Sequence, residues 1–172
     1  MMKLFGAILI LISTSISGWM FAKRFAERPK QIRQLCQALA LLETDIVYGS
    51  RPLSEAFAHI AHREPAAIGS IFHRCAVHLQ ELDGASTFEC WEKALSEVWP
   101  RLDLQAAEKE ILLDFGKTLG MSDRDDQLQH LQLTVSNLQV EENHAREEQG
   151  QYEKMWKSVG VLGGALLIIL LY

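Results

Sequence analysis

The last fifty residues, 123–172, most constrain the fold because they have the pattern of one uninterrupted helix. No proline occurs from Asp123 to Tyr172, and apolar or small residues recur in steps of three and four between Leu128 and Val159. After Lys157 the polar face disappears, and residues 158–172 carry no charge. A helix that is amphipathic in its first half and apolar all round in its second half joins a polar domain rigidly to a membrane.

The N-terminal segment Leu4–Ala22 is a second apolar stretch without charge. Its length is close to the ~20 residues of a membrane-spanning helix, and Trp19 stands near an expected interface. A cleaved signal peptide is the alternative, because Lys3 precedes the apolar run. However, Ser13–Gly18 is a weak cleavage site and two cations follow Ala22 directly, which favours a retained anchor.

Cations flank the inner sides of both apolar segments. They are Lys23, Arg24, Arg28, Lys30, Arg33, Lys154 and Lys157, whereas Lys3 lies on an outer side. The positive-inside rule therefore predicts that residues 23–157 are cytosolic and that both short tails point outward.

The C-terminal apolar segment is short, because residues 156–172 give a helix of about 24 Å against a hydrocarbon core of ~30 Å. Local thinning of the bilayer can absorb the mismatch, and a hydrophobic tail docked into a soluble core is the alternative. Gly160 and Gly164 have the spacing that allows close packing of membrane helices.

Apolar periodicity is helical nearly throughout residues 23–157, with no strand-like alternation, so we expect an all-α bundle. Pro29 is expected to break or kink the chain. Shorter helices are predicted around residues 32–46, 53–60, 68–79, 86–99 and 104–119, with a capping box at Ser86 and Glu89. The expected organisation is an N-terminal membrane helix at 1–22, a cytosolic bundle at 23–157 and a C-terminal membrane helix at 158–172.

Charge is divided unevenly along this middle region. Residues 23–33 hold five cations and one acid, which suits a membrane-proximal collar, whereas residues 81–148 hold sixteen acids and six bases. The acidic half would be repelled by phosphates, which argues against nucleic acid as a partner. It could receive a basic protein surface, or it is a solvated face.

The usual catalytic motifs are absent: there is no Walker A loop, dinucleotide fingerprint, nucleophile elbow or HExxH. We therefore expect no enzyme and no cofactor. The best metal candidate is Glu55, His59 and His62 on one helix face, which keeps a metal-dependent enzyme as an alternative. Acidic pairs such as Asp125/Asp126 and Glu141/Glu142 are interpreted as solvated charges, and Cys36, Cys75 and Cys90 as reduced core thiols.

Four segments carry a resemblance to a known family. They are AKRFAERPKQIRQL at 22–35, FECWEKALSEVW at 88–99, FGKTLGMSD at 115–123 and YEKMWKSVGVLGGALLIILL at 152–171. With the N-terminal apolar segment, they make the chain resemble the stage III sporulation protein AB family from end to end. That family is similar to the cytoplasmic helical domain of the inner-membrane platform protein of type II secretion and type IV pilus machines.

The resemblance implies a non-enzymatic membrane component of the channel complex between mother cell and forespore in endospore-forming bacteria. It also implies a cognate secretion-type ATPase and other membrane proteins as partners, no small-molecule substrate, and a location on the mother-cell side of the outer forespore membrane. A passive anchor without ATPase coupling is a further alternative.

The segment 115–127 holds the candidate site. The family's pattern continues as Asp-x-x-x-Gln, which Asp123 and Gln127 fit. Gly116 suits a close helix crossing, and Gly120 suits a left-handed cap that lets the chain reverse. Asp123 or Ser122 could cap the final helix. Gly116, Gly120, Asp123 and Gln127 are therefore candidate turn or partner-binding residues.

Overall fold

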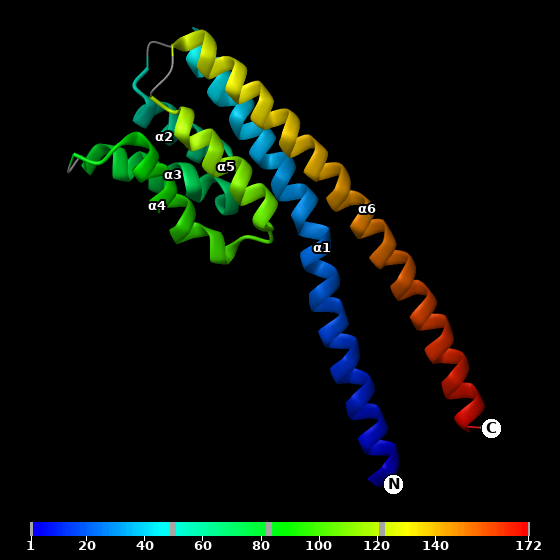
Figure 1. The fold of residues 1–172 in the computed structure, drawn as a ribbon. Helices are drawn as coiled ribbons and strands as arrows, with labels where there is room; N and C mark the ends of the chain where they lie inside the picture. The colour runs from blue at the N-terminus through cyan, green and yellow to red at the C-terminus, as the bar shows by residue number, and fades with distance from the viewer. Residues whose placement is uncertain (1, 49–50, 82–83, 121–122, 172) are drawn as a thin grey trace.

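Two long helices form the frame of the molecule in the computed structural model (Figure 1). α1 (Met2–Tyr48) and α6 (Arg124–Leu171) lie side by side and run in opposite directions. Between them come α2 (Leu53–Arg63), α3 (Ala66–Glu81), α4 (Thr87–Val98), the short 3-10 helix η1 (Trp99–Arg101) and α5 (Ala106–Thr118). The structure describes residues 2–48, 51–81, 84–120 and 123–171, with side chains between 25 and 155 except at 124, 153 and 154. Every element in these ranges is helical, which confirms the all-α class.

The long C-terminal helix is confirmed, and of the two outcomes expected at Pro29, a break or a kink, the break is wrong. α1 continues through Pro29 as one helix. A proline in a helix interior costs about 3 kcal/mol because it removes a hydrogen bond and crowds the preceding turn. Ile32, Leu35 and Leu39, which follow Pro29 on one face, are fully buried. Packing of this face offsets the local cost of the proline.

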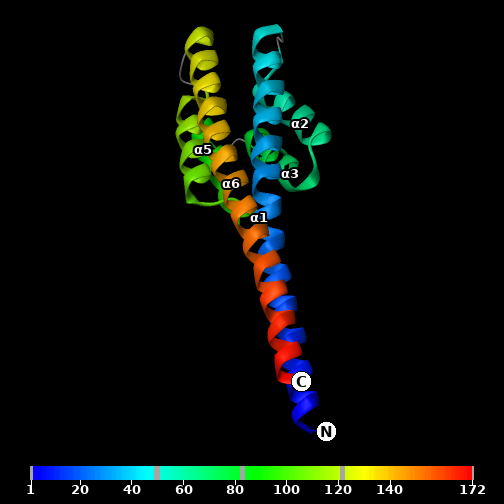
Figure 2. The same ribbon diagram turned by 90° about the vertical axis from the view of Figure 1, so that its right-hand side faces the viewer.

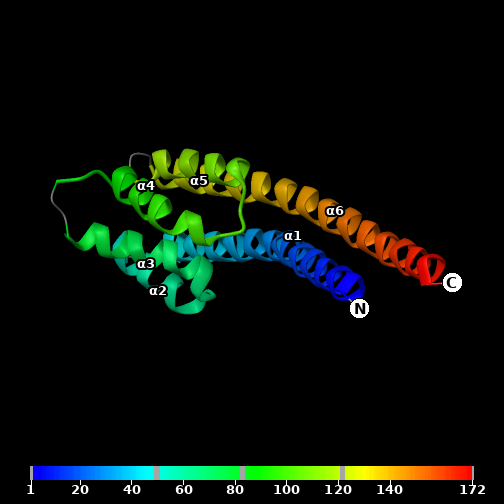
Figure 3. The same ribbon diagram turned by 90° about the horizontal axis from the view of Figure 1, so that it is seen from below.

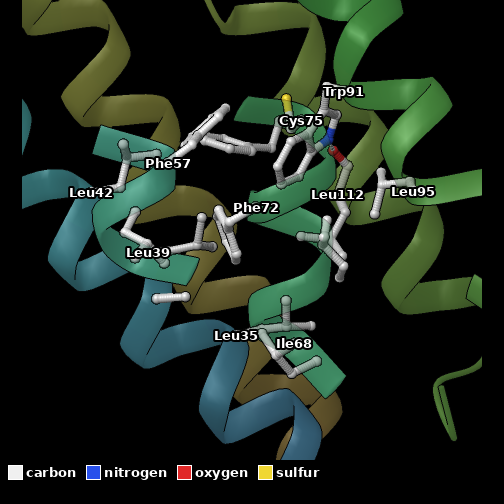
Figure 4. Packing of buried hydrophobic residues seen from close by; sticks show 14 of the residues in the cluster. Leu35, Leu39, Leu42, Phe57, Ile68, Phe72, Cys75, Trp91, Leu95 and Leu112 are labelled. Atoms are coloured by element: carbon white, nitrogen blue, oxygen red, sulfur yellow. Dashed lines mark hydrogen bonds between the residues drawn. The ribbon is translucent and has the colours of Figure 1, made fainter. Parts of the chain in front are cut away.

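Aromatic side chains fill the centre of the bundle around Trp91 (Figure 4). The ring centroids of Phe57, Phe72 and Phe115 each lie 5.7 Å from that of Trp91, at the tilted or edge-on angles that aromatic pairs favour. The indole Nε1 donates a hydrogen bond of 2.7 Å to the carbonyl oxygen of Leu112. Trp91 therefore ties α4 to α2, α3 and α5.

Capping boxes mark the starts of α4 and α5. The Ser86 hydroxyl accepts from the Glu89 amide and the Glu89 carboxylate accepts from the Ser86 amide, so the predicted capping box is confirmed. α5 begins later than expected, at Ala106, because Gln105 and Glu108 form a second capping box there. Leu104 stays buried but precedes the helix.

The short helices pack on one side of the long pair, along its distal half (Figure 1). α5 packs beside α6, whereas α2 and α3 pack against α1 (Figure 2). Seen from below, α1 and α6 extend together away from this bundle (Figure 3). Both chain termini therefore lie at the same end of the molecule, and we call the opposite end, with Tyr48 and the α5–α6 turn, the distal end.

Among the residues that the structure describes, no helix contains a stretch long and apolar enough to cross a membrane. The segments 1–22 and 158–172, which the sequence assigns to the membrane, lie outside the part of the chain with described side chains. The boundaries at 22 and 157 stay predictions.

Candidate partner-docking site at the distal end

Gly116 lies in the core rather than on a surface. It is buried on α5, and a Cβ atom built on it would lie 2.3 Å from the Trp91 Cδ1 atom. Real side chains never approach so closely, so only glycine lets the indole ring lie against this turn of α5. The expected close helix crossing is therefore the contact of α4 with α5.

Gly120 reverses the chain between α5 and α6. Its φ angle is 78°, the left-handed conformation that glycine adopts without strain. Leu119, the C-terminal cap of α5, donates its amide to the carbonyl oxygen of Gly116 at 3.2 Å. The left-handed cap expected at Gly120 is present, and Gly120 itself is exposed at the distal end.

Two open hollows meet at Gly120. The first is lined by Gly120, Gln127, Asp45, Arg51, apolar residues of α1 and α2, and Leu119 at the end of α5. The second, on the α4 side, is lined by Ser86, Thr87, Phe88, Lys117, Leu119 and Gly120. The fold thus brings Gly120 and Gln127 together in one hollow. Asp45 and Arg51 line the same hollow, and sequence reasoning did not assign them to the site.

Carboxylates surround the start of α6. The Asp123 carbonyl oxygen accepts a hydrogen bond of 2.9 Å from the Gln127 amide, so Asp123 opens the helix. Asp123, Asp125 and Asp126 are all exposed. Negative charge at a helix N-terminus is favourable because it opposes the positive end of the helix dipole. The distal end therefore has an acidic rim, which we define as Asp123, Asp125 and Asp126.

Asp45 closes one side of the first hollow through a contact with α2. Its Oδ2 atom lies 3.3 Å from the His59 Nδ1 atom. Glu55 and His62 are exposed, and the described residues include no group of three histidine, cysteine, aspartate or glutamate side chains arranged to hold a metal ion. The structure therefore pairs His59 with Asp45 and does not assemble the triad of Glu55, His59 and His62.

Sequence reasoning missed a buried ion-pair network at the other end of the bundle. Arg28 is 4% exposed, and its Nε and Nη2 atoms donate to the same oxygen of the fully buried Glu108, at 2.9 and 2.6 Å. Its Nη1 atom donates to Glu148 at 2.7 Å, and Nη2 also lies 3.3 Å from Glu141. Arg28 is thus a structural link between α1, α5 and α6, and its assignment to a membrane-facing collar is wrong.

The interpretation of Glu141/Glu142 as solvated charges is also wrong. Glu142 is 8% exposed and accepts hydrogen bonds from Arg33, at 3.0 Å, and from Arg146. A signal was present in the sequence, since Glu141, Glu142 and Glu148 are spaced in threes and fours from the buried Leu138 and Ala145. Acids on the apolar face of a helix need basic partners, and α1 supplies them.

The three cysteines are free thiols. Cys75 and Cys90 are buried and Cys36 is half-buried, which agrees with the expected core role. Burial raises the pKa of all three thiols, so each favours the protonated form. Such thiols are poor nucleophiles and poor metal ligands.

Comparison with known proteins decides the family. The model of the family described as stage III sporulation protein AB matches residues 3–172. The chain belongs to the stage III sporulation protein AB family. A curated relative, stage III sporulation protein AB of Bacillus subtilis (strain 168), is 42% identical over 172 residues, which cover 99% of both chains. A solved structure of stage III sporulation protein AB is 38% identical, with a TM-score of 0.69, and the match covers 73% of this chain and 98% of that one.

Membership in the stage III sporulation protein AB family supports a role in a sporulation complex. It does not assign roles to single residues, so the partner-binding role of Gly120, Asp123 and Gln127 stays a prediction. Gly160 and Gly164 lie outside the residues with described side chains.

Proposed function

We propose that the chain is a non-enzymatic platform component of a sporulation complex, anchored in the cell membrane by both ends, with its bundle on the mother-cell side of the outer forespore membrane. The observation that carries the proposal is the antiparallel arrangement of α1 and α6 (Figure 1). Because of it, the two uncharged segments at 4–22 and 158–172 leave the bundle at the same end. Both could then enter one bilayer while the α5–α6 turn faces away from it.

The length of α6 sets the reach of this platform. From Asp123 to Ser158, at 1.5 Å per residue, the helix holds the acidic rim about 50 Å from the start of the C-terminal apolar segment. A partner at that distance meets the distal end without touching the bilayer. The distal end is therefore the part of the bundle best suited to a large cytosolic protein.

The partner that we propose is the secretion-type ATPase that the family resemblance implies. The acidic rim favours a basic surface on that protein, and the hollow between Gly120 and Gln127 could receive an apolar side chain from it. Contacts of this kind weaken with added salt, because exposed charges are screened beyond about 10 Å at 0.1 M ionic strength.

Charge reversal at the rim tests the docking. The double change Asp125→Lys and Asp126→Lys in the full-length membrane protein should reduce co-purification of the ATPase. The co-purification that remains should depend less on salt concentration. A control reverses one exposed acid away from the rim, Glu92 on α4, and should leave capture unchanged. If the rim variant is folded by circular dichroism and captures the ATPase as well as wild type does, the acidic rim is a solvated surface and the docking proposal is wrong.

A second experiment tests the membrane segments. Replacing Gly160 and Gly164 with leucine should reduce the native-size membrane complex by blocking close helix packing, while ATPase capture persists. If the variant with leucine at positions 160 and 164 still forms the native-size complex, the two apolar segments are simple anchors. If the charge-reversal variant and the leucine variant both keep the native-size membrane complex and ATPase capture, a passive anchor is the better description.

A further inference from the structure

The turn between α4 and α5 lies beside the part of α1 that is nearest the N-terminal apolar segment. Phe25 and Arg28 of α1 line an open hollow together with Pro100, Arg101 and other residues up to 105. On the opposite long helix, Tyr152 stacks on Phe25 with ring centroids 3.8 Å apart. The α4–α5 turn, residues 99–105, therefore lies beside the α1 segment that begins at the Phe25–Tyr152 pair.

Hydrogen bonds hold the turn at this height. The Asp103 amide donates to the Gln31 Oε1 atom at 2.9 Å, and Gln31 Nε2 lies 3.5 Å from the Asp103 carboxylate. Directly after the turn, the buried Glu108 binds Arg28. Both partners are on α1, so the turn cannot slide along that helix without breaking one buried and two part-buried polar contacts.

The depth of the turn follows from helix geometry and rests on the proposed membrane anchoring. Phe25 is three residues beyond Ala22, where the predicted span ends, which is a rise of about 5 Å. The headgroup layer on each side of a bilayer is about 5 to 7 Å thick. The part of the α4–α5 turn beside Phe25, with Pro100 and Arg101, is then at the outer edge of the lipid headgroups, whereas Asp103, bonded to Gln31, is farther from the bilayer.

The exposed chemistry of the turn fits that layer. Pro100 and Arg101 are exposed at its tip, and Trp99 is half-buried. Lys109, on the first turns of α5, holds its Nζ atom 5.8 Å from the centroid of the Trp99 ring. Tryptophan beside lysine and arginine is the combination that proteins use at membrane interfaces, where an apolar ring body and a cation are both accommodated.

We propose that the α4–α5 turn docks on the surface of the membrane and binds the phosphates of anionic lipids through Arg101 and Lys109. The bundle then touches the bilayer at a third place besides the two apolar segments. Three contacts that are not in line fix the tilt of a rigid body. The turn therefore orients the distal end relative to the membrane.

Depth-dependent fluorescence quenching of the full chain in vesicles tests this docking. The background carries alanine at the native cysteines, Cys36, Cys75 and Cys90, with helicity checked by circular dichroism. Single environment-sensitive labels are then placed at Pro100→Cys, at Asp126→Cys in the acidic rim and at Val161→Cys in the C-terminal apolar segment. The vesicles are phosphatidylcholine with or without phosphatidylglycerol, and they carry a nitroxide at either the headgroup or the middle of the acyl chain.

The headgroup nitroxide should quench the label at position 100 in phosphatidylglycerol vesicles and leave the label at 126 unquenched. Each of the changes Arg101→Glu and Lys109→Glu removes a cation, which by itself should lower the ratio of docked to undocked turns by roughly fivefold. Each also adds an acid, which should lower the ratio further. Lys117→Glu, at the other end of α5, is the matched charge control and should leave quenching unchanged.

The label at position 161 separates this inference from the proposed anchoring. If the acyl-chain nitroxide quenches position 161 while position 100 stays unquenched, the docking is wrong and the anchoring stands. If position 161 is not quenched, both fail. Quenching at position 100 that is equal without phosphatidylglycerol and insensitive to charge reversal would overturn the recognition of anionic lipid.

Discussion

The indole ring of Trp91 covers Gly116 so closely that a single added methyl group would lie 2.3 Å from the Trp91 Cδ1 atom. The same ring contacts three phenylalanines and donates a hydrogen bond to Leu112. Trp91 therefore has little freedom to move away, and the α4–α5 contact depends on the absence of a side chain at Gly116.

The first prediction is that Gly116→Ala destabilises the protein by about 1 to 3 kcal/mol, the usual cost of overpacking a core. Urea unfolding of the purified chain measures the effect. Gly150→Ala is the matched control, because Gly150 is also helical but a Cβ atom there meets no atom within 4 Å. That control should stabilise the helix by roughly 0.5 to 1 kcal/mol. Equal midpoints for the two variants would contradict the packing argument.

The second prediction concerns the left-handed turn. Gly120→Val should lower the free energy of unfolding by about 1 to 2 kcal/mol, because a β-branched side chain is strained at positive φ. Gly120→Asn should cost less, since asparagine tolerates that conformation. Thermal unfolding of both variants measures the difference. Valine and asparagine variants of the same stability would exclude backbone strain as the cause.

The third prediction concerns the buried ion pairs. Arg28→Met should destabilise the protein by about 3 to 5 kcal/mol, because it leaves the fully buried Glu108 carboxylate without its cation. Adding Glu108→Gln should recover part of the loss. Lys30→Met is the control, because Lys30 forms an exposed pair with Glu27 that is worth less than about 1 kcal/mol. Denaturant midpoints for wild type, Arg28→Met, Glu108→Gln and the double variant measure the coupling, and a strictly additive double variant would count against the link.

The fourth prediction is a pH dependence that arises from Cys36. Burial, with a smaller contribution from the Glu142 charge, raises the pKa of this thiol from 9.0 to about 11. A group whose pKa is raised by folding stabilises the native state fully below its unfolded pKa, and that contribution is lost as the pH rises through the folded value. Stability relative to Cys36→Ser should therefore fall between pH 9 and about 11. A constant difference between the two proteins across that range would show that Cys36 does not ionise differently on folding.

The sequence alone was sufficient for features that depend on neighbouring residues. The unbroken helix from Arg124 to Leu171 follows from apolar periodicity without proline. The capping box at Ser86 and Glu89 and the reversal at Gly120 follow from hydrogen bonds and backbone angles within a few positions. Such interactions are encoded within one or two turns of chain, so their residue types and spacing identify them.

Tertiary structure alone decided which helix faces pack against each other. That packing determined the roles of the charged residues. Arg28 looks like a membrane-proximal cation in the sequence, but it is buried against Glu108, 80 positions away. Pro29 looks like a helix break, yet the packed face that follows it keeps α1 continuous. The hollow that joins Asp45 to Gly120 and Gln127 likewise needs α1, α2, α5 and α6 to be in place. The physical reason is that the free energy of a buried charge, or of a strained backbone, depends on groups that the chain brings close only when it folds.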